Sequence, residues 1–505
     1  CQDLCPAWNT GKPLSPKLFV LALRDHHAAV APYLRAADAL GVAPEEVSEE
    51  MLAQRHDGGG IAGRLSGMTD GLENSDRLGL APGSAHTGDV LGALLAARAA
   101  PAETGVATRP APLAGEVIPA DVLWSCTTCG ACVDQCPVDI EHLDHVIDVR
   151  RQQVLMESAF PKELGQMFRK MESRGNPWGL APRKRMDWAK GLDFEVPVIG
   201  ADVEDASEVD YLFWVGCAGA FEDRAKKTTR AVAELLHIAG VSFAVLGDAE
   251  SCTGDPARRA GNEILYQMLA SQNVETLTEA RAQRIVVTCA HCFNTISREY
   301  PQIGGHFEVL HYTQLLSRFV REGRLKPVAP QSGRTPTAGA AGQQGPAPAA
   351  EGTTESTEQA DVAGPTEPAD VAGPAEQAGQ EAAQPAAPTV TYHDACYLGR
   401  HNRVYSPPRE LLEATGAATV EMPRNRETAF CCGGGGAKAF MEESIGTRIA
   451  VERSREAIGT GAQVIATACP FCTTMLSDGV AGQGADVRVT DVATLMLEAV
   501  HRGQE

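Results

Sequence analysis

Four cysteines of this chain are each matched by a second cysteine 179 or 180 positions later. The matched pairs are Cys217 and Cys396, Cys252 and Cys432, Cys289 and Cys469, and Cys292 and Cys472. A spacing kept so closely over so long a separation indicates an internal duplication. The chain is therefore predicted to fold into two similar domains, each of which presents the same set of thiols.

Both copies of the duplication alternate short runs of branched and aromatic residues with amphipathic stretches. The runs that predict strands are 211–215, 243–246, 285–288 and 307–310 in the first copy, and 389–393, 419–422, 464–467 and 487–490 in the second. Strands that alternate with helices indicate βαβ units and a parallel sheet. Parallel sheets carry their functional residues at the carboxyl ends of the strands, so we expect the thiols to meet there.

The second copy offers one thiol more than the first. Its five cysteines, which include an adjacent pair, are Cys396, Cys431, Cys432, Cys469 and Cys472. A regular four-iron cube needs only four thiolates, so five indicate an unusual metal centre. Four glycines follow the adjacent pair. Gly433 and Gly434 are predicted to let the backbone approach a bound cluster closely or adopt a positive φ angle.

The first copy has Ser251 where the second has Cys431. Its four remaining thiols are those of Cys217, Cys252, Cys289 and Cys292. Three interpretations stay open: a cluster with altered ligation, a tetrahedral zinc site, which four thiolates ending in a C-x2-C pair would suit, or a degenerate site without metal. Nearby His291, His393 and His401 are candidate proton donors or, alternatively, polar neighbours with satisfied hydrogen bonds.

Another cysteine pattern precedes the duplication. The segment CTTCGACVDQCP has the ligand spacing of bacterial two-cluster ferredoxins, in which three close thiolates hold one [4Fe–4S] cube and the fourth ligates the other cube. Its cysteines are Cys126, Cys129, Cys132 and Cys136. The chain opens with Cys1 and Cys5, spaced like the second half of a similar run. These residues predict electron transfer through iron–sulfur clusters, and the absence of an initial Met suggests that a longer protein continues upstream.

Composition divides the chain into four predicted regions. They are a helical ferredoxin-type domain with a long insertion over 1–207, a first cysteine-rich α/β domain over 208–330, a disordered linker over 331–388 and a second cysteine-rich α/β domain over 389–505. The linker is rich in Ala, Gly, Pro, Gln, Glu and Thr, so it cannot bury enough apolar surface to offset the entropy of ordering. In the first region, apolar spacing predicts helices over 17–40 and 141–171.

The charge balance and the apolar runs exclude some classes of protein. A net charge of −21 argues against a nucleic-acid partner. No apolar run reaches the roughly 20 residues that a membrane-spanning helix needs. Clustered thiols in a long acidic chain differ from a secreted disulfide scaffold and indicate the reducing, cytosolic side of the membrane.

These motifs, with the segments YHDACYLGRHN and FCCGGGG, resemble the heterodisulfide reductase D-like family of iron–sulfur proteins, and especially actinobacterial membrane-linked iron–sulfur reductases. The resemblance implies one cube on Cys5, Cys126, Cys129 and Cys132. A second cube would use Cys1 and Cys136 with two upstream cysteines, and is half-liganded in this sequence. The resemblance further implies that the five cysteines of the second copy are catalytic and hold a noncubane [4Fe–4S] cluster.

The function implied by the resemblance is that of an iron–sulfur oxidoreductase. Single electrons would pass through the cubes to the noncubane cluster for thiol/disulfide chemistry linked to the quinone pool. The alternative is the electron-transfer subunit of a flavin-dependent hydroxy-acid dehydrogenase. Expected partners are a cytochrome-b-like membrane domain or subunit, the quinone pool or a flavoprotein, at the cytoplasmic face of the cell membrane. A zinc-stabilised scaffold without redox activity is a third hypothesis.

Overall fold

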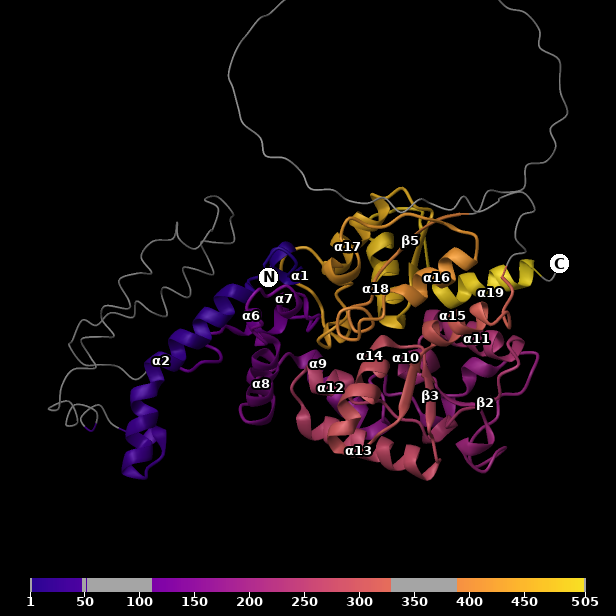
Figure 1. The fold of residues 1–505 in the computed structure, drawn as a ribbon. Helices are drawn as coiled ribbons and strands as arrows, with labels where there is room; N and C mark the ends of the chain where they lie inside the picture. The colour runs from indigo at the N-terminus through magenta and orange to yellow at the C-terminus, as the bar shows by residue number, and fades with distance from the viewer. Residues whose placement is uncertain (1, 48–50, 52–110, 328–387, 504–505) are drawn as a thin grey trace, which may run out of the picture. The chain divides into compact units, whose positions relative to one another are not determined.

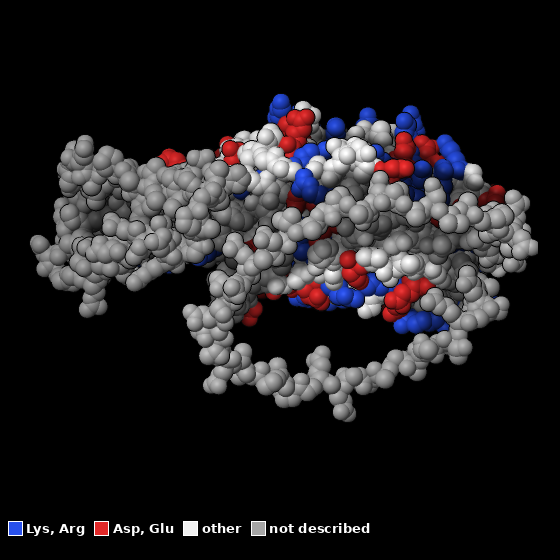
Figure 2. Space-filling view, turned by 90° about the horizontal axis from the view of Figure 1, so that it is seen from above, with Lys and Arg blue, Asp and Glu red and all other residues white. Residues whose placement is uncertain are grey.

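The computed structural model describes residues 2–47, 51, 111–327 and 388–503 (Figure 1). Cys1 and residues 331–387 of the predicted linker lie outside these ranges, so the predictions made for them remain predictions. Of the described helices, none is both long enough and apolar enough to span a membrane. On the face that Figure 2 shows, the basic and acidic side chains of the described residues are interspersed.

The described residues before the first sheet are mainly helical. The helices are α1 (Pro6–Asn9), α2 (Pro16–Leu40), α6 (Ala120–Ser125), α7 (Ala131–Asp134), α8 (His142–Leu155) and α9 (Lys162–Arg174). Helix α2 begins where the Ser15 hydroxyl accepts a hydrogen bond from the Leu18 amide at 3.3 Å. It ends at Gly41, whose φ of 67° suits a left-handed cap. The predicted helix 17–40 is therefore confirmed.

The single helix predicted over 141–171 is wrong, because the chain breaks between α8 and α9. Ser158 has a φ of 52°, which no right-handed helix allows. Pro161 then stands directly before α9 and disfavours helical backbone at the residue before it. Apolar spacing continues across this break, which explains why the sequence suggested one helix.

The first sheet lies in the first copy of the duplication and is entirely parallel. Its strands are β1 (Tyr211–Trp214), β2 (Phe243–Ala244), β3 (Arg284–Val287) and β4 (Glu308–His311), in the order β2-β1-β3-β4. The accompanying helices are α10 (Gly216–Phe221), α11 (Asp223–Ile238), α12 (Asp255–Arg259), α13 (Glu263–Glu279), α14 (Ala290–Asn294) and α15 (Tyr312–Arg321). Strand β1 is buried at every position, as expected for a parallel sheet covered on both faces.

The second sheet repeats the first. Its strands are β5 (Thr389–Tyr392), β6 (Ala418–Thr419), β7 (Val464–Thr467) and β8 (Arg488–Asp491), and their order β6-β5-β7-β8 is equivalent to that of the first sheet. The helices are α16 (Ser406–Ala414), α17 (Ile449–Ile458), α18 (Pro470–Ala481) and α19 (Val492–Arg502). The predicted α/β fold with two repeated domains and parallel sheets is therefore confirmed.

The two copies pack against each other through equivalent helices (Figure 1). Helix α11 contacts α19, and α15 contacts α16. Because α15 and α19 occupy the same place in their copies, as do α11 and α16, the same contact is made twice. The Tyr312 hydroxyl, at the start of α15, donates to Asp491 Oδ1, before α19, at 2.6 Å. One hydrophobic core joins residues of the helical region and both copies.

Candidate metal centres

The thiols of the ferredoxin-type run gather at the ends of short helices. Cys5 precedes α1, Cys126 follows α6, and Gly130, with a φ of 74°, starts α7. One cavity is lined by all four thiols that the resemblance assigned to a single cube, those of Cys5, Cys126, Cys129 and Cys132. Cys136, for which the resemblance implied a place in the other cube, does not line this cavity. We refer to the four as the front thiols.

The front thiols suit a positively charged metal group. Burial, and then the neighbouring thiols, raise the pKa of Cys5 and of Cys132, because a thiolate is poorly solvated there and close to others. A bound metal reverses that balance, since it stabilises thiolates directly. The Thr128 amide already donates to Cys126 Sγ at 3.3 Å, the kind of contact that tunes a cluster sulfur.

The five thiols of the second copy are buried together at the carboxyl ends of its strands. Cys396 follows β5, and Cys469 follows β7 directly before α18, which contains Cys472. Neighbouring thiols shift one another's pKa in series, and the interacting pairs are Cys396 with Cys431, Cys431 with Cys432, Cys432 with Cys472 and Cys472 with Cys469. The structure thus brings together all five residues that the sequence singled out. We call them the rear thiols.

The geometry around the rear thiols fits a thiolate-bound cluster. A nitrogen of His393 and the sulfurs of Cys432 and Cys472 all lie within 4.8 Å of one another. Hydrogen bonds from neighbouring thiols lower the pKa of Cys432 and Cys469, which favours the thiolate form that metals need. Gly433 has a φ of 93°, and its amide donates to Cys431 Sγ at 3.2 Å.

The glycines after the rear pair bring two distant backbones into contact. A Cβ atom on Gly434 would lie 3.7 Å from Cys432 Sγ. A Cβ atom on Gly435 would lie only 2.3 Å from the carbonyl oxygen of Thr127, within the ferredoxin-type run. Cys129 and Cys431 also shift each other's pKa, which is raised for Cys129 and lowered for Cys431. The front and rear thiols are therefore neighbours, which the sequence did not reveal.

The first copy also brings its four thiols together, but its surroundings differ. Cys217 interacts with Cys252, and Cys289 with Cys292. Arg185 donates to Cys217 Sγ at 3.1 Å and to Glu250 at 2.7 Å. The Ser251 hydroxyl donates to Asn273 Oδ1 at 2.8 Å. Ser251 is therefore engaged with an amide, and among the described residues no fifth thiol replaces the missing cysteine.

The first-copy thiols meet the rear thiols across the boundary between the copies. Cys289 and Cys469 shift each other's pKa, which is raised for Cys289 and lowered for Cys469. The sulfurs consequently form one series that runs from the front thiols through the rear thiols to the first-copy thiols. This spatial order differs from the order along the chain, where the first copy comes before the second.

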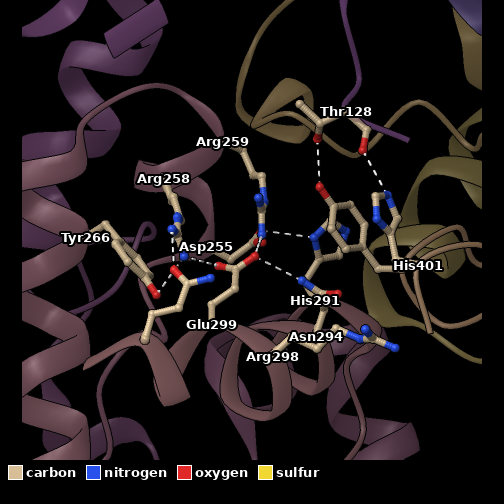
Figure 3. Close-up of polar contacts among 12 residues, drawn as sticks. Thr128, Asp255, Arg258, Arg259, Tyr266, His291, Asn294, Arg298, Glu299 and His401 are labelled. Carbon is tan, nitrogen blue, oxygen red and sulfur yellow. Dashed lines mark hydrogen bonds and ion pairs between the residues drawn. The ribbon is translucent and has the colours of Figure 1, made fainter. Parts of the chain in front are cut away.

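The three candidate histidines occupy different electrostatic environments. Burial lowers the pKa of His291, but Asp255, 2.9 Å away, more than offsets this and leaves the pKa raised (Figure 3). Burial and then Arg453 lower the pKa of His393 to about 3, so that its Nδ1 accepts a hydrogen bond from Arg453 Nε at 3.0 Å. His401 lies near Thr128, with its Nε2 3.2 Å from the Thr128 carbonyl oxygen.

Two buried side chains that the sequence analysis missed join the three regions. The Tyr397 hydroxyl lies 2.8 Å from Thr128 Oγ1, and its ring lies 4.3 Å from both the His291 and His401 rings. Arg150 is fully buried. It donates to backbone carbonyls of all three regions, those of Leu123, Cys126, Arg259 and Gly436. Arg150 belongs to no motif, and Tyr397 lies in the segment YHDACYLGRHN without being singled out, so only the folded chain shows what they hold together.

Comparison with known proteins places the chain among iron–sulfur oxidoreductases. The family model of the cysteine-rich CCG domain matches residues 211–297 and 390–477. The probable iron-sulfur-binding oxidoreductase FadF of Bacillus subtilis is 35% identical over 511 residues, which cover 99% of this chain and 58% of that protein. The EtfAB:quinone oxidoreductase of Syntrophomonas wolfei is 32% identical over 514 residues, with 99% and 57% covered.

A third relative belongs to a heterodisulfide reductase. The dihydromethanophenazine:CoB–CoM heterodisulfide reductase of Methanosarcina barkeri has a polypeptide that is 28% identical over 395 residues, which cover 75% of this chain and 78% of that polypeptide. The predicted resemblance to the heterodisulfide reductase D-like iron–sulfur oxidoreductases is thereby confirmed, and the chain carries two CCG domains. It spans 58% and 57% of the length of the two more similar relatives.

Proposed function

We propose that this iron–sulfur oxidoreductase passes electrons from the front thiols to the rear thiols, where a small substrate, of which a disulfide is the first candidate, is reduced. The front thiols would hold a [4Fe–4S] cube and the five rear thiols a noncubane cluster. Such clusters accept and release single electrons. The observation that carries the proposal is the close approach of the two segments that hold these thiols, where a Cβ atom on Gly435 would lie 2.3 Å from the Thr127 carbonyl oxygen.

The residues of the chain would orient and tune the two centres. The backbone contact between Gly435 and Thr127 fixes how near the centres lie. The amides of Thr128 and Gly433 donate to sulfurs in the two sets and would stabilise the reduced state of each. Burial of the rear thiols excludes water, which protects a reduced centre from side reactions.

For the first-copy thiols, we propose a metal with altered ligation. Four buried thiols converge, and Arg185 supplies a positive charge beside Cys217. Zinc would be bound by the same four thiolates. Metal analysis after substitution of Cys292 separates these possibilities, because loss of iron and loss of zinc are distinct results.

A second function is favoured by a relative. The name EtfAB:quinone oxidoreductase describes electron transfer between a flavoprotein and a quinone. With that function, this chain would transfer electrons between a flavoprotein and a quinone-linked, cytochrome-b-like membrane domain or subunit. The chain would lie at the cytoplasmic face of the membrane. The alternative function, as the electron-transfer subunit of a hydroxy-acid dehydrogenase, differs from this one only in which flavoprotein donates the electrons.

The partition of ligands is tested by paired substitutions. Cys432→Ser should abolish the EPR signal of the rear centre and leave that of the front cube, whereas Cys126→Ser should do the reverse. Both variants are compared in anaerobically purified protein, with iron and inorganic sulfide measured for each. Loss of both signals in each variant, or of neither, would contradict the partition. Stoichiometric zinc without sulfide would contradict the whole proposal and favour the scaffold hypothesis.

A further inference from the structure

A cavity of about 560 Å³ lies beside the rear thiols. Its volume falls within the range of about 300–1,000 Å³ that is typical of small-molecule sites. Phe471, which separates Cys469 from Cys472, forms part of its wall, as does Met475 one turn later on α18. The lining also includes Ala218, the neighbour of Cys217. A molecule in the cavity would therefore be one side chain away from the proposed rear centre.

One wall of the cavity is a set of three aromatic rings that pack on one another. The Trp178 ring lies 5.7 Å from that of Phe440 and 6.4 Å from that of Phe471, and the two phenylalanine rings are 6.0 Å apart. Phe440 packs edge-to-face on both other rings, whereas Trp178 and Phe471 are stacked, and these contacts hold each ring in place. The wall is therefore a preformed apolar surface that suits a flat or apolar ligand body.

The acidic side chains that line the cavity are mostly already engaged. Glu443 pairs with Lys12 at 2.9 Å, and Asp478 pairs with Arg224 at 2.9 Å. Glu222 accepts a hydrogen bond from the Ala225 amide at 2.7 Å, as the cap of α11. Glu442, the fourth, is exposed to solvent. Most of the acidic side chains are thus engaged, although Glu443 Oε1 has no hydrogen-bond partner among the described residues.

Unlike most of these acidic side chains, the side chain of Lys438 has no hydrogen-bond or ion-pair partner among the described residues. It lines the cavity and is only 7% exposed. Burial of a cation is costly because it loses its hydration shell, and the main opposite charge that acts on Lys438 is that of Glu443, which already pairs with Lys12. Arg448, at the exposed rim, is a second cation whose side chain has no such partner among the described residues.

We propose that this cavity binds the substrate of the rear centre, and that the substrate is an organic anion with an apolar body. Lys438 holds the anionic group, Arg448 attracts it at the rim, and the body lies against the wall of Trp178, Phe440 and Phe471. This inference rests on the proposed function and adds the class of substrate. Charge-assisted hydrogen bonds make Lys438 the main source of selectivity for anions.

The test compares a charged probe with its neutral isostere. Binding of 2-naphthoate and of 2-naphthamide to the anaerobically purified full chain is measured by calorimetry. We expect naphthoate to bind more tightly, and Lys438→Met to weaken it by about tenfold or more, as a charge-assisted hydrogen bond implies, without weakening naphthamide. Lys438→Arg should retain most of the affinity. Lys190→Met, at an exposed lysine paired with Asp187, is the matched control and should change nothing.

A second variant covers the case in which Lys438→Met does not fold. Thr474→Trp, on the cavity wall, should fill the space and abolish binding of both probes. Equal binding of the two probes, unchanged naphthoate affinity in Lys438→Met, or naphthoate affinity that survives Thr474→Trp would overturn the inference. Iron, sulfide and EPR signals are recorded on the same samples. Normal clusters without selective binding refute only this inference, whereas selective binding without clusters refutes only the proposed function.

Discussion

At the scale of single residues, Arg150 connects the backbone segments that lie next to the front and rear thiols. Its guanidinium reaches the Cys126 carbonyl at 2.7 Å, that of Leu123 at 2.8 Å and that of Arg259 at 2.9 Å. No carboxylate takes part in these contacts. Its charge is instead shared among peptide oxygens of three regions, so the residue fixes backbone positions rather than neutralising an acid.

Replacement of Arg150 should therefore affect both stability and the front centre. Arg150→Met leaves buried carbonyl oxygens without donors, and we expect it to lower the free energy of unfolding by about 3 kcal/mol. The EPR signal assigned to the front cube should broaden or shift, because the Cys126 backbone is released. Arg150→Lys, which keeps the charge but cannot reach all of these oxygens, should be intermediate. A variant that unfolds like the parent in urea would contradict this role.

At the scale of elements, the helices that close the two copies begin with different caps at equivalent positions. His311 precedes α15, and its Nδ1 lies 2.8 Å from Thr313 Oγ1. Asp491 precedes α19, and its carboxylate accepts a hydrogen bond from the Ala493 amide at 2.9 Å. Burial lowers the pKa of His311 to about 4 and raises that of Asp491 to about 7. The two caps thus make stability depend on pH with opposite signs.

The histidine cap gives a testable pH dependence. Below the ordinary pKa of about 6.5, the unfolded chain binds a proton that folded His311 does not, so stability falls as the pH falls toward about 4. His311→Asn keeps a good cap without a titratable group. We expect this variant to lose less stability than the parent between about pH 7 and about pH 5, by about 1 kcal/mol or more. Parallel urea unfolding curves for the two proteins at both pH values would count against it.

The glycine-rich segment after Cys432 makes a sharper prediction about distance. Gly435→Ala would place a methyl group 2.3 Å from the Thr127 carbonyl oxygen, so the ferredoxin-type run has to move. Gly434→Ala is the matched control, since its nearest neighbour, Met475 Cγ at 3.2 Å, belongs to a flexible side chain. We expect dipolar coupling between the front and rear EPR signals to weaken in the first variant and persist in the second. Unchanged coupling in both would show that this contact does not set the distance.

Much of this architecture could be predicted from local patterns. All eight strands lie within a few residues of the predicted runs, because buried parallel strands are continuous and apolar. The rear thiols were found because C-x2-C spacing and an adjacent pair are rare. The break before α9 was missed, since apolar spacing continues through it. Contacts such as Gly435 with Thr127 or Cys289 with Cys469 could not be predicted, because packing between distant segments leaves no periodic trace in the sequence.

At the scale of the whole molecule, the two copies are held together by more than the segment that joins them. Tyr312 bonds to Asp491, and Arg298 Nε donates to Asn402 Oδ1 at 2.6 Å. The helix pairs α11 with α19 and α15 with α16 bury apolar side chains in a common core. The chain between the copies is therefore not needed to maintain their association.

Limited proteolysis tests this independence. Cleavage is expected first within 331–387, where the composition predicts a linker. The two fragments should then co-elute in size-exclusion chromatography and keep their EPR signals, because the interface between the copies is intact. Fragments that separate under native conditions would show that the covalent connection is required.

The contact of Gly435 with Thr127 has a consequence for how such proteins diversify. The spacing between the two proposed redox centres would be set by this backbone contact, and neither of these residues lines the cavity. Mutations that reshape the cavity wall for a new substrate would therefore leave the electron-transfer distance between the two centres unchanged. The rate of electron transfer, which depends on that distance, would be kept as well. Related proteins could accordingly evolve to use different substrates while they keep the same path for electron transfer.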